Sequence, residues 1–334
     1  LHQEANSKLG FSSKSTMRAA HKLYQEGKIT YMRTDSVNLS GQAIAAATDF
    51  IKRLYGVQYS HVRKFKTKSA GAQEAHEAIR PTDISRETAS NNEYDQKLYD
   101  LIRRRTLASQ MAPAQLENTT IIIEISGQTL VFEARGQVVI FDGFLRVYGG
   151  GKEDALLPKL ASGDTLDPHT IEAKQVFARP PARYSEGALV KKLEELGIGR
   201  PSTYATIINT VQTRGYAEKG EDEGQARDVI VLQLLDGEID REIIQEKTGS
   251  NRGKLVPTPA GELISDFLGN HFEQVVDYGF TASVEKHFDD IASDKLDRNS
   301  MLESFYTPFH ELIAKSGDID RSKVGNSREV GTDP

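Results

Sequence analysis

The chain of 334 residues contains one pattern twice, at positions 187 residues apart. Residues 9–16 read Leu-Gly-Phe-x-x-x-Ser-Thr, and residues 196–203 read Leu-Gly-Ile-x-x-x-Ser-Thr. Each copy leads into a stretch with the apolar periodicity of an amphipathic helix, at residues 17–26 and 204–214. The sequence therefore predicts the same small helical unit twice in the fold.

Each predicted helix is followed by a stop signal and a β-prone stretch. Gly27 ends one helix and Gly215 ends the other, as expected because glycine often follows the last helical turn. Residues 28–33 and 216–219 then favour extended structure. Each copy of the repeat is predicted to be a turn, a capped helix and a strand.

The second copy is expected to form a winged helix. A further amphipathic helix is predicted at residues 186–196, which makes a helix-turn-helix with the helix at 204–214. A hairpin from residues 216–219 to residues 228–235, with Glu-Asp-Glu-Gly at residues 221–224 near its tip, would supply the wing. The second helix of such a unit often contacts nucleic acid, although a small packing unit without DNA contact would show the same pattern.

The residue composition of the chain differs between residues 112 and 181. Runs rich in β-branched and aromatic residues occur at residues 119–125, 129–134 and 138–141, and glycines, including Gly136, separate them. Such short runs with turn residues between them predict strands and hairpins. This region is expected to be a β domain.

The last third of the chain is predicted to be helical, with a helix at residues 260–268 that follows two prolines.

The expected fold class is mixed multi-domain α and β, with two winged-helix or helix-turn-helix domains joined by a β-rich domain. The predicted domains are a helical domain at 1–111, a β-rich hinge or arch at 112–181, a helical base at 182–315 and a disordered polar tail at 316–334.

The run Gly-Lys-Ile-Thr-Tyr-Met-Arg-Thr-Asp-Ser at residues 27–36 places a tyrosine two residues from an arginine. Tyrosine can act as a covalent nucleophile, but its ordinary pKa of about 10 leaves little phenolate at neutral pH. Residues i and i+2 of an extended segment point to the same side, so Arg33 is expected beside the Tyr31 hydroxyl. Its guanidinium would hold a phosphodiester and stabilise charge in the transition state while Tyr31 attacks.

This run closely resembles the active-site segment of bacterial type IA DNA topoisomerases. Two further stretches match the same family: Glu-Ala-His-Glu-Ala-Ile-Arg-Pro at residues 74–81 and Gly-Ile-Gly-Arg-Pro-Ser-Thr-Tyr-Ala at residues 197–205. The resemblance continues through residues 280–282 and Glu285. It implies single-strand cleavage through a 5′-phosphotyrosine, passage of another strand and resealing, with ATP-independent relaxation of negatively supercoiled DNA.

The resemblance also implies roles for other residues. It places His76 near the bound strand close to Tyr31, although a lone histidine is more often structural. Ser202 can act simply as an N-cap, and Arg214 can simply interact with a helix C-terminus. The family pattern instead assigns DNA contact to four residues of the second repeat: Arg200, Ser202, Thr203 and Arg214.

Charge is distributed unevenly along the chain. The net charge of −6 argues against a nucleic-acid partner, but residues 1–110 hold 18 Lys and Arg against 11 Asp and Glu, whereas residues 217–334 hold 13 against 25. The basic third contains Tyr31. Its basic cluster at residues 63–68 is by default a solvated loop.

The sequence contains no cysteine, which excludes disulfides and thiolate zinc sites, and it shows no long apolar run or signal peptide.

The resemblance leaves one family feature unmatched. Type IA enzymes carry a metal-binding (toprim) domain with an Asp-x-Asp-x-Glu signature, and the acidic stretch at residues 221–223 does not fit it. We therefore expect a fragment that starts after this domain and also lacks C-terminal zinc modules. Mg²⁺ would be bound by the absent domain, with no metal site in this fragment and no ATP. The fragment is expected to bind single-stranded DNA weakly without relaxing supercoils.

Three alternatives remain open from the sequence. The nearest alternative is a topoisomerase III-like decatenase, although the amino-acid sequence of residues 27–36 is more similar to the topoisomerase I branch. A non-catalytic winged-helix protein would bind duplex DNA regardless of Tyr31, and a structural scaffold would not bind DNA. For the type IA topoisomerase I interpretation we expect a monomer in the bacterial cytoplasm, at the nucleoid. Its partners would be single-stranded and negatively supercoiled DNA, with no membrane contact.

Overall fold

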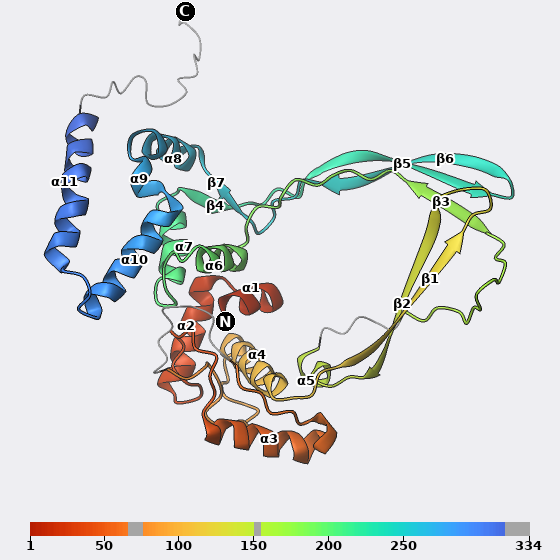
Figure 1. Ribbon diagram of the computed structural model, residues 1–334, viewed down its shortest axis with the longest axis horizontal. Coiled ribbons are helices and arrows are strands. Elements are labelled where there is room, and N and C mark those ends of the chain that lie inside the picture. Colours follow the sequence, from red (N-terminus) through yellow and green to blue (C-terminus); the bar gives the residue numbers. More distant parts are fainter. Residues whose placement is uncertain (66–75, 150–154, 318–334) are drawn as a thin grey trace, which may run out of the picture. The chain divides into compact units, whose positions relative to one another are not determined.

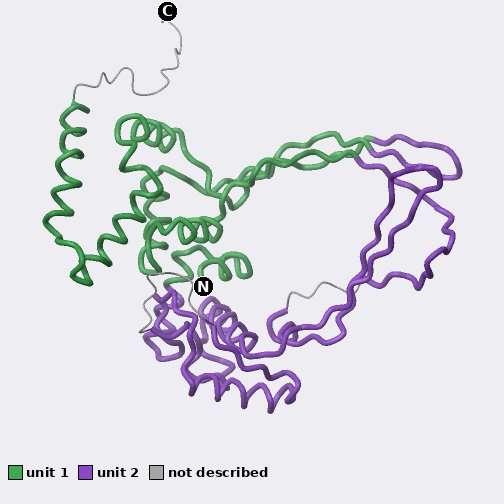
Figure 2. Tube along the Cα trace, in the orientation of Figure 1, with its two compact units in different colours: residues 1–17, 175–230, 243–334 green, residues 18–174, 231–242 purple. Residues whose placement is uncertain are grey.

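The computed structural model describes residues 1–65, 76–149 and 155–317. The chain divides into two compact units (Figure 2). Unit 1 consists of Leu1–Met17, Gln175–Ile230 and Ile243–Pro334, and unit 2 consists of Arg18–Lys174 and Val231–Glu242. Several sequence features fall outside the described residues, namely Glu74, Ala75, Lys66, Lys68 and the tail beyond Gly317.

Figure 1 shows the helices, and several of them begin at a residue whose side chain caps the first turn. Side chains of Ser40, Asn92, Ser185, Thr258 and Asp297 accept hydrogen bonds from the first-turn amides of their helices. No helix in the described part of the chain combines the length and apolar character needed to span a membrane. The longer helices are α1 (His2–Leu9), α2 (Ser13–Gln25), α3 (Gly41–Tyr55), α4 (Glu93–Ser109), α6 (Glu186–Glu195), α7 (Tyr204–Thr213), α8 (Pro259–His271), α10 (Tyr278–Ala292) and α11 (Arg298–Ser316); the short ones are η1 (Val57–Tyr59), α5 (Leu145–Tyr148) and α9 (Glu273–Val276).

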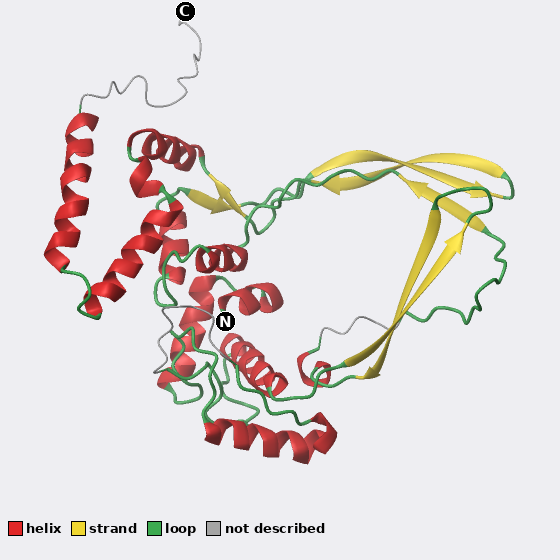
Figure 3. Cartoon of the chain, viewed as in Figure 1, coloured by secondary structure: helices red, strands yellow, loops and turns green. Residues whose placement is uncertain are grey.

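In the part of the chain that the structure describes, the strands form three small antiparallel sheets (Figure 3). A long ribbon pairs β1 with β2, a second sheet has the order β3-β5-β6, and β4 pairs with β7. Most residues of β1 are exposed, as expected for a ribbon of two strands that no helix covers. The strands are β1 (Gln115–Glu124), β2 (Val131–Phe141), β3 (Thr170–Lys174), β4 (Ala217–Lys219), β5 (Gln225–Leu235), β6 (Glu238–Thr248) and β7 (Leu255–Pro257).

The two copies of the repeat end their helices in the same way. The amide of Lys28 donates to the carbonyl of Leu23 after α2, and the amide of Tyr216 donates to the carbonyl of Val211 after α7. Gly27 and Gly215 lie between these groups with φ of 65° and 68°, which is a left-handed conformation that favours glycine. The predicted helices at 17–26, 204–214 and 186–196 are confirmed, and α2 begins four residues earlier than expected.

The predicted hairpin between residues 216–219 and 228–235 is wrong. β4 pairs instead with β7. Even the closest pair of register partners, Lys219 and Leu255, is separated by 36 positions in the chain. β5 takes up the second segment and joins β6 through Asp236 and Gly237, whose φ values are 50° and 84°. Asp-Gly is a strong signal for a tight two-residue hairpin turn, and this local pairing occupies β5.

Two other strand predictions also need correction. Residues 28–33 form only an isolated bridge, between Ile29 and Pro81. Gly136 does not separate two strands, because β2 runs through it. A Cβ at this position would lie 2.6 Å from the carbonyl oxygen of Ala155, so the glycine allows a close backbone approach within a continuous strand.

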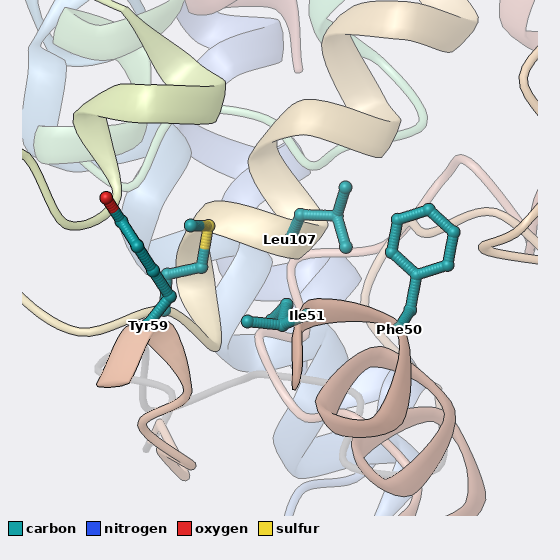
Figure 4. Packing of buried hydrophobic residues seen from close by; sticks show 5 residues of the cluster. Phe50, Ile51, Tyr59 and Leu107 are labelled. Carbon is teal, nitrogen blue, oxygen red and sulfur yellow. The ribbon is translucent and has the colours of Figure 1, made fainter. Parts of the chain in front are cut away.

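A buried cluster in unit 2 anchors the β1–β2 ribbon to the helices (Figure 4). Phe141 at the end of β2 packs against this cluster, and its ring centroid lies 4.8 Å from that of Tyr59. The Tyr59 hydroxyl donates to Asp142 over 2.6 Å. The ribbon is therefore fixed at its root by both apolar packing and a hydrogen bond. The cluster consists of Phe50, Ile51, Tyr59, Leu107 and Met111.

Candidate active site

Tyr31 lies on an irregular segment that directly follows the end of α2. The neighbouring side chains of Ile29 and Met32 are buried, with exposed fractions of 1% and 5%, whereas Tyr31 is half-buried. Buried residues on both sides hold the segment against the core. The tyrosine is therefore presented at the surface from a fixed backbone.

Thr30 joins this segment to the segment that carries His76. Its hydroxyl donates to the carbonyl of Ala78 over 2.7 Å and accepts from the amide of Arg80 over 2.9 Å. The amide of Thr30 also donates to the carbonyl of Arg80 over 2.9 Å. Three hydrogen bonds thus fix the two candidate active-site segments relative to each other.

The ring of Tyr31 lies between two other aromatic rings. The Tyr24 ring, from the last turn of α2, is edge-on to it with centroids 5.4 Å apart and an interplanar angle of 68°. The His76 ring is also edge-on, at 5.4 Å and 63°. Edge-to-face pairs of this kind restrict ring orientation. The structure thus brings together Tyr31 and His76, two of the residues predicted from the sequence.

His76 offers an unused polar atom beside the tyrosine. Its Nδ1 is buried and has no hydrogen-bond partner within the described residues. Buried polar atoms are normally paired, so an orphaned nitrogen at a candidate site indicates a group that can receive a ligand. This atom fits the expected contact of His76 with a bound strand.

Glu77 and Arg80 form a bidentate ion pair that stabilises the segment carrying His76. Arg80 Nε and Nη2 donate to the two carboxylate oxygens of Glu77, each over 2.8 Å, and Glu77 also accepts from the amide of Ser40 at the start of α3. Burial alone would raise the pKa of Glu77, but the hydrogen bonds from Arg80 and Ser40 outweigh it and lower the pKa below its usual range. Both side chains act as structural supports here.

Arg33 is exposed, and no polar contact with a described residue places it on the Tyr31 hydroxyl. The same-side argument required an extended strand, which residues 28–33 do not form. Its expected role beside the nucleophile therefore stays a prediction.

The other predicted site residues belong to unit 1, around the start and end of α7. Thr203, not Ser202, is the N-cap residue, and its hydroxyl accepts from the amide of Arg200 over 2.8 Å instead of capping the helix. Ser202 is exposed. Arg214 is the exposed C-cap residue of the same helix. The guanidinium of Arg200 is bound by carboxylates of α10.

Comparison with known proteins agrees with this fold. The family described as DNA topoisomerase matches residues 1–230. DNA topoisomerase 1 of Zymomonas mobilis is 41% identical over 332 residues, covering 96% of this chain and 24% of the relative. DNA topoisomerase 1 of Pseudomonas aeruginosa is 39% identical over 321 residues, covering 94% and 33%. The structure of full-length topoisomerase I from Thermotoga maritima is 32% identical with a TM-score of 0.73, covering 95% and 49%.

The chain therefore belongs to the DNA topoisomerases of type IA, which are isomerases. The relatives named above are all topoisomerase I proteins, so the similarity favours the topoisomerase I branch expected from the sequence. The mixed α and β fold matches the Thermotoga structure. The chain spans about a quarter to just under half the length of the curated relatives, between 24% and 44%.

The residues around Tyr31 do not fit a magnesium site, although the family uses Mg²⁺. No group of three or more His, Asp or Glu able to hold a metal occurs among the described residues. The carboxylate of Glu77 is already occupied by Arg80 and Ser40. Octahedral Mg²⁺ needs carboxylate oxygens that are free to bind it.

The sequence did not single out three residues of the site. Thr30 and Glu77 lie inside the recognised motifs, but their hydrogen bonds with Arg80 became visible only in the fold. Tyr24 precedes Tyr31 by seven residues on a different element, and only the reversal at Gly27 brings the rings together. A tyrosine in the last turn before a helix-ending glycine was the available signal.

Replacing Tyr24 by leucine is expected to slow covalent capture of DNA by up to about tenfold, because an aromatic pair contributes roughly 0.5–1.5 kcal/mol to ring placement. Tyr24→Phe, which retains the ring, should be close to normal. The measurement is the rate of adduct formation in a longer chain that joins this segment to the metal-binding segment of a relative. Equal rates for Tyr24→Leu and Tyr24→Phe would show that the contact does not orient Tyr31.

Proposed function

We propose that this chain is the cleavage and gate portion of a type IA topoisomerase that relaxes negatively supercoiled DNA without ATP. The supporting observation is the placement of Tyr31, whose ring lies 5.4 Å from that of His76, on a segment fixed by Thr30. The Nδ1 of His76 is free of described partners beside it. A nucleophile with a fixed orientation next to a potential phosphate ligand suits phosphoryl transfer.

In the proposed reaction the Tyr31 oxygen attacks a phosphorus atom of a single strand. The new O–P bond forms a 5′-phosphotyrosine as the phenol releases its proton to solvent, the bond from phosphorus to the 3′ oxygen breaks, and the 3′ oxygen takes up a proton from solvent and leaves as a hydroxyl. Arg33 would stabilise negative charge on the phosphate, and His76 would position it. Resealing reverses these steps, so the energy of the phosphodiester is retained in the covalent link.

Strand binding is assigned to Arg200, Ser202, Thr203 and Arg214 in unit 1. A domain layout of 1–111, 112–181 and 182–315, with the β-rich part as hinge, would let the broken strand open and admit another. Mg²⁺ would be held by residues outside this chain and would stabilise charge at the scissile phosphate. We further propose that the protein acts as a monomer at the bacterial nucleoid.

The chain itself is expected to bind single-stranded DNA weakly and to leave supercoiled plasmid unrelaxed in Mg²⁺. Fluorescence anisotropy with matched single-stranded and duplex oligonucleotides measures the preference, and plasmid gels measure relaxation. A duplex preference with sequence specificity would favour a non-catalytic winged-helix protein. Strong relaxation by the purified chain would contradict the assignment of the metal-binding residues to another segment. In the longer chain, decatenation faster than relaxation would favour a topoisomerase III-like enzyme.

A further inference from the structure

Arg200, which precedes α7, is held by two carboxylates of α10 within unit 1. Its Nη2 lies 3.3 Å from Asp289 Oδ2 and 3.5 Å from Glu285 Oε2. Its Nη1 donates to the carbonyl of Gly199 over 3.2 Å. The arginine that we assign to strand binding is therefore already occupied by negative charge.

The two carboxylates outnumber the guanidinium. Glu285 and Asp289 are four residues apart on α10 and so share one face of the helix. Two negative charges around one positive charge leave this cluster with a net negative charge, which repels a phosphate. The side chain of Arg200 is 34% exposed, and those of Glu285 and Asp289 are 23% and 58% exposed. A phosphate can therefore reach the cluster from solvent and compete for the arginine.

Carboxylate and phosphate oxygens both accept from guanidinium N–H groups, so a phosphate can replace the carboxylates at Nη2 of Arg200. We propose that Glu285 and Asp289 act as a carboxylate clamp that occupies Arg200 when no strand is bound and lowers the affinity for single-stranded DNA. The inference rests on the proposed strand-binding role of Arg200. The carboxylates of the clamp compete with the bound strand for Arg200. This competition favours release of the strand after resealing.

The clamp makes a specific prediction about salt. When a strand displaces the carboxylates, they regain counterions, and this uptake offsets the counterions that the phosphate releases. Removing the carboxylate charges should therefore steepen the dependence of log K on log salt. The expected change in slope is about 0.7 for one phosphate contact on a single strand.

The experiment measures binding of the purified chain to a fluorescent single-stranded oligonucleotide by anisotropy over a range of salt concentrations. Glu285→Gln with Asp289→Asn is expected to raise the affinity about fivefold, which corresponds to about 1 kcal/mol for releasing exposed ion pairs. Asp290→Asn with Asp294→Asn is the matched control, since it also removes two carboxylate charges, from the end of α10 and the turn that follows it. Asp290→Asn alone is the control for Asp289→Asn alone. A gain no larger than that of the control would overturn the clamp.

Arg200→Ala separates the clamp from the proposed function. If Arg200 binds the strand, its removal lowers the affinity, and adding the two carboxylate substitutions to it gives no gain beyond the control. If Arg200→Ala leaves the affinity unchanged, the strand-binding role fails and the clamp fails with it. If Arg200→Ala weakens binding but the carboxylate variants do not strengthen it, only the clamp fails. Should the double variant not fold, Asp289→Asn alone is used, because this more exposed carboxylate must still give part of the gain.

Discussion

Replacing Tyr31 by phenylalanine is expected to abolish covalent capture of DNA while leaving the fold and DNA binding intact. Phenylalanine keeps the ring that contacts Tyr24 and His76 and removes only the hydroxyl. That hydroxyl forms no hydrogen bond with any residue that the structure describes, so its loss leaves no partner unpaired. The chemical step, in contrast, loses its nucleophile, because residues 27–36 contain no other tyrosine.

The measurement uses a longer chain that contains this segment together with the metal-binding segment of a relative. A single-stranded oligonucleotide labelled at its 3′ end is added with Mg²⁺ and the reaction is stopped with detergent, because a 5′-phosphotyrosine keeps the 3′ label on the protein. Tyr24→Phe is the matched control, since it removes a hydroxyl from the adjacent ring. An adduct that survives in Tyr31→Phe and vanishes in Tyr24→Phe would identify Tyr24 as the nucleophile.

Local signals in the sequence were enough to place the helices that were predicted individually, α2, α6, α7 and α8. Capping side chains and helix-ending glycines act within a few residues, and α6 and α7 end within one residue of their predicted limits. The same holds for the motif around Tyr31, whose residues are contiguous. Where a feature depends on neighbours in the chain, periodicity and turn chemistry are sufficient.

Features that depend on long-range pairing could not be predicted in this way. The partner of β4 is β7, and nothing in the short segment at 217–219 specifies a strand that begins at Leu255. The Asp236-Gly237 turn was a local signal for the β5–β6 hairpin, and it excludes the wing that the sequence suggested. The contacts of Arg200 with α10 likewise join residues more than 80 positions apart.

The two copies of the repeat, each taken together with the helix that precedes it (α1 or α6), contact each other within unit 1, which the sequence did not reveal. The carboxylate of Glu186, at the start of α6, accepts from the amide of Ser13 over 2.6 Å, and the side chain of Asn6 accepts from the amide of Gly187 over 3.1 Å. Each copy thus supplies a side chain to a backbone amide of the other. Glu186 is only 3% exposed and also pairs with Lys219 over 2.9 Å.

Replacing Glu186 by glutamine is therefore expected to lower the local stability of α1 and α6 by about 2 kcal/mol, the usual contribution of a hydrogen bond to a charged group. Hydrogen exchange of the backbone amides in these two helices measures this loss directly. Glu195→Gln is the matched control, because it removes the same charge from an exposed position at the end of α6. Equal exchange in the two variants would show that the buried carboxylate does not join the repeats.

The pH dependence gives a second test of the same contact. Burial would raise the pKa of Glu186, but the hydrogen bonds from Lys219 and Ser13 outweigh it and hold the pKa below its usual range. A carboxyl whose pKa is lower in the folded state stabilises the fold above its unfolded pKa of about 4.3, and this contribution is lost as pH falls through the folded pKa. The difference in exchange between wild type and Glu186→Gln should therefore be full near neutral pH and shrink in acid. A difference that grows on acidification would mean that Glu186 is protonated in the folded protein and joins the two copies without its charge.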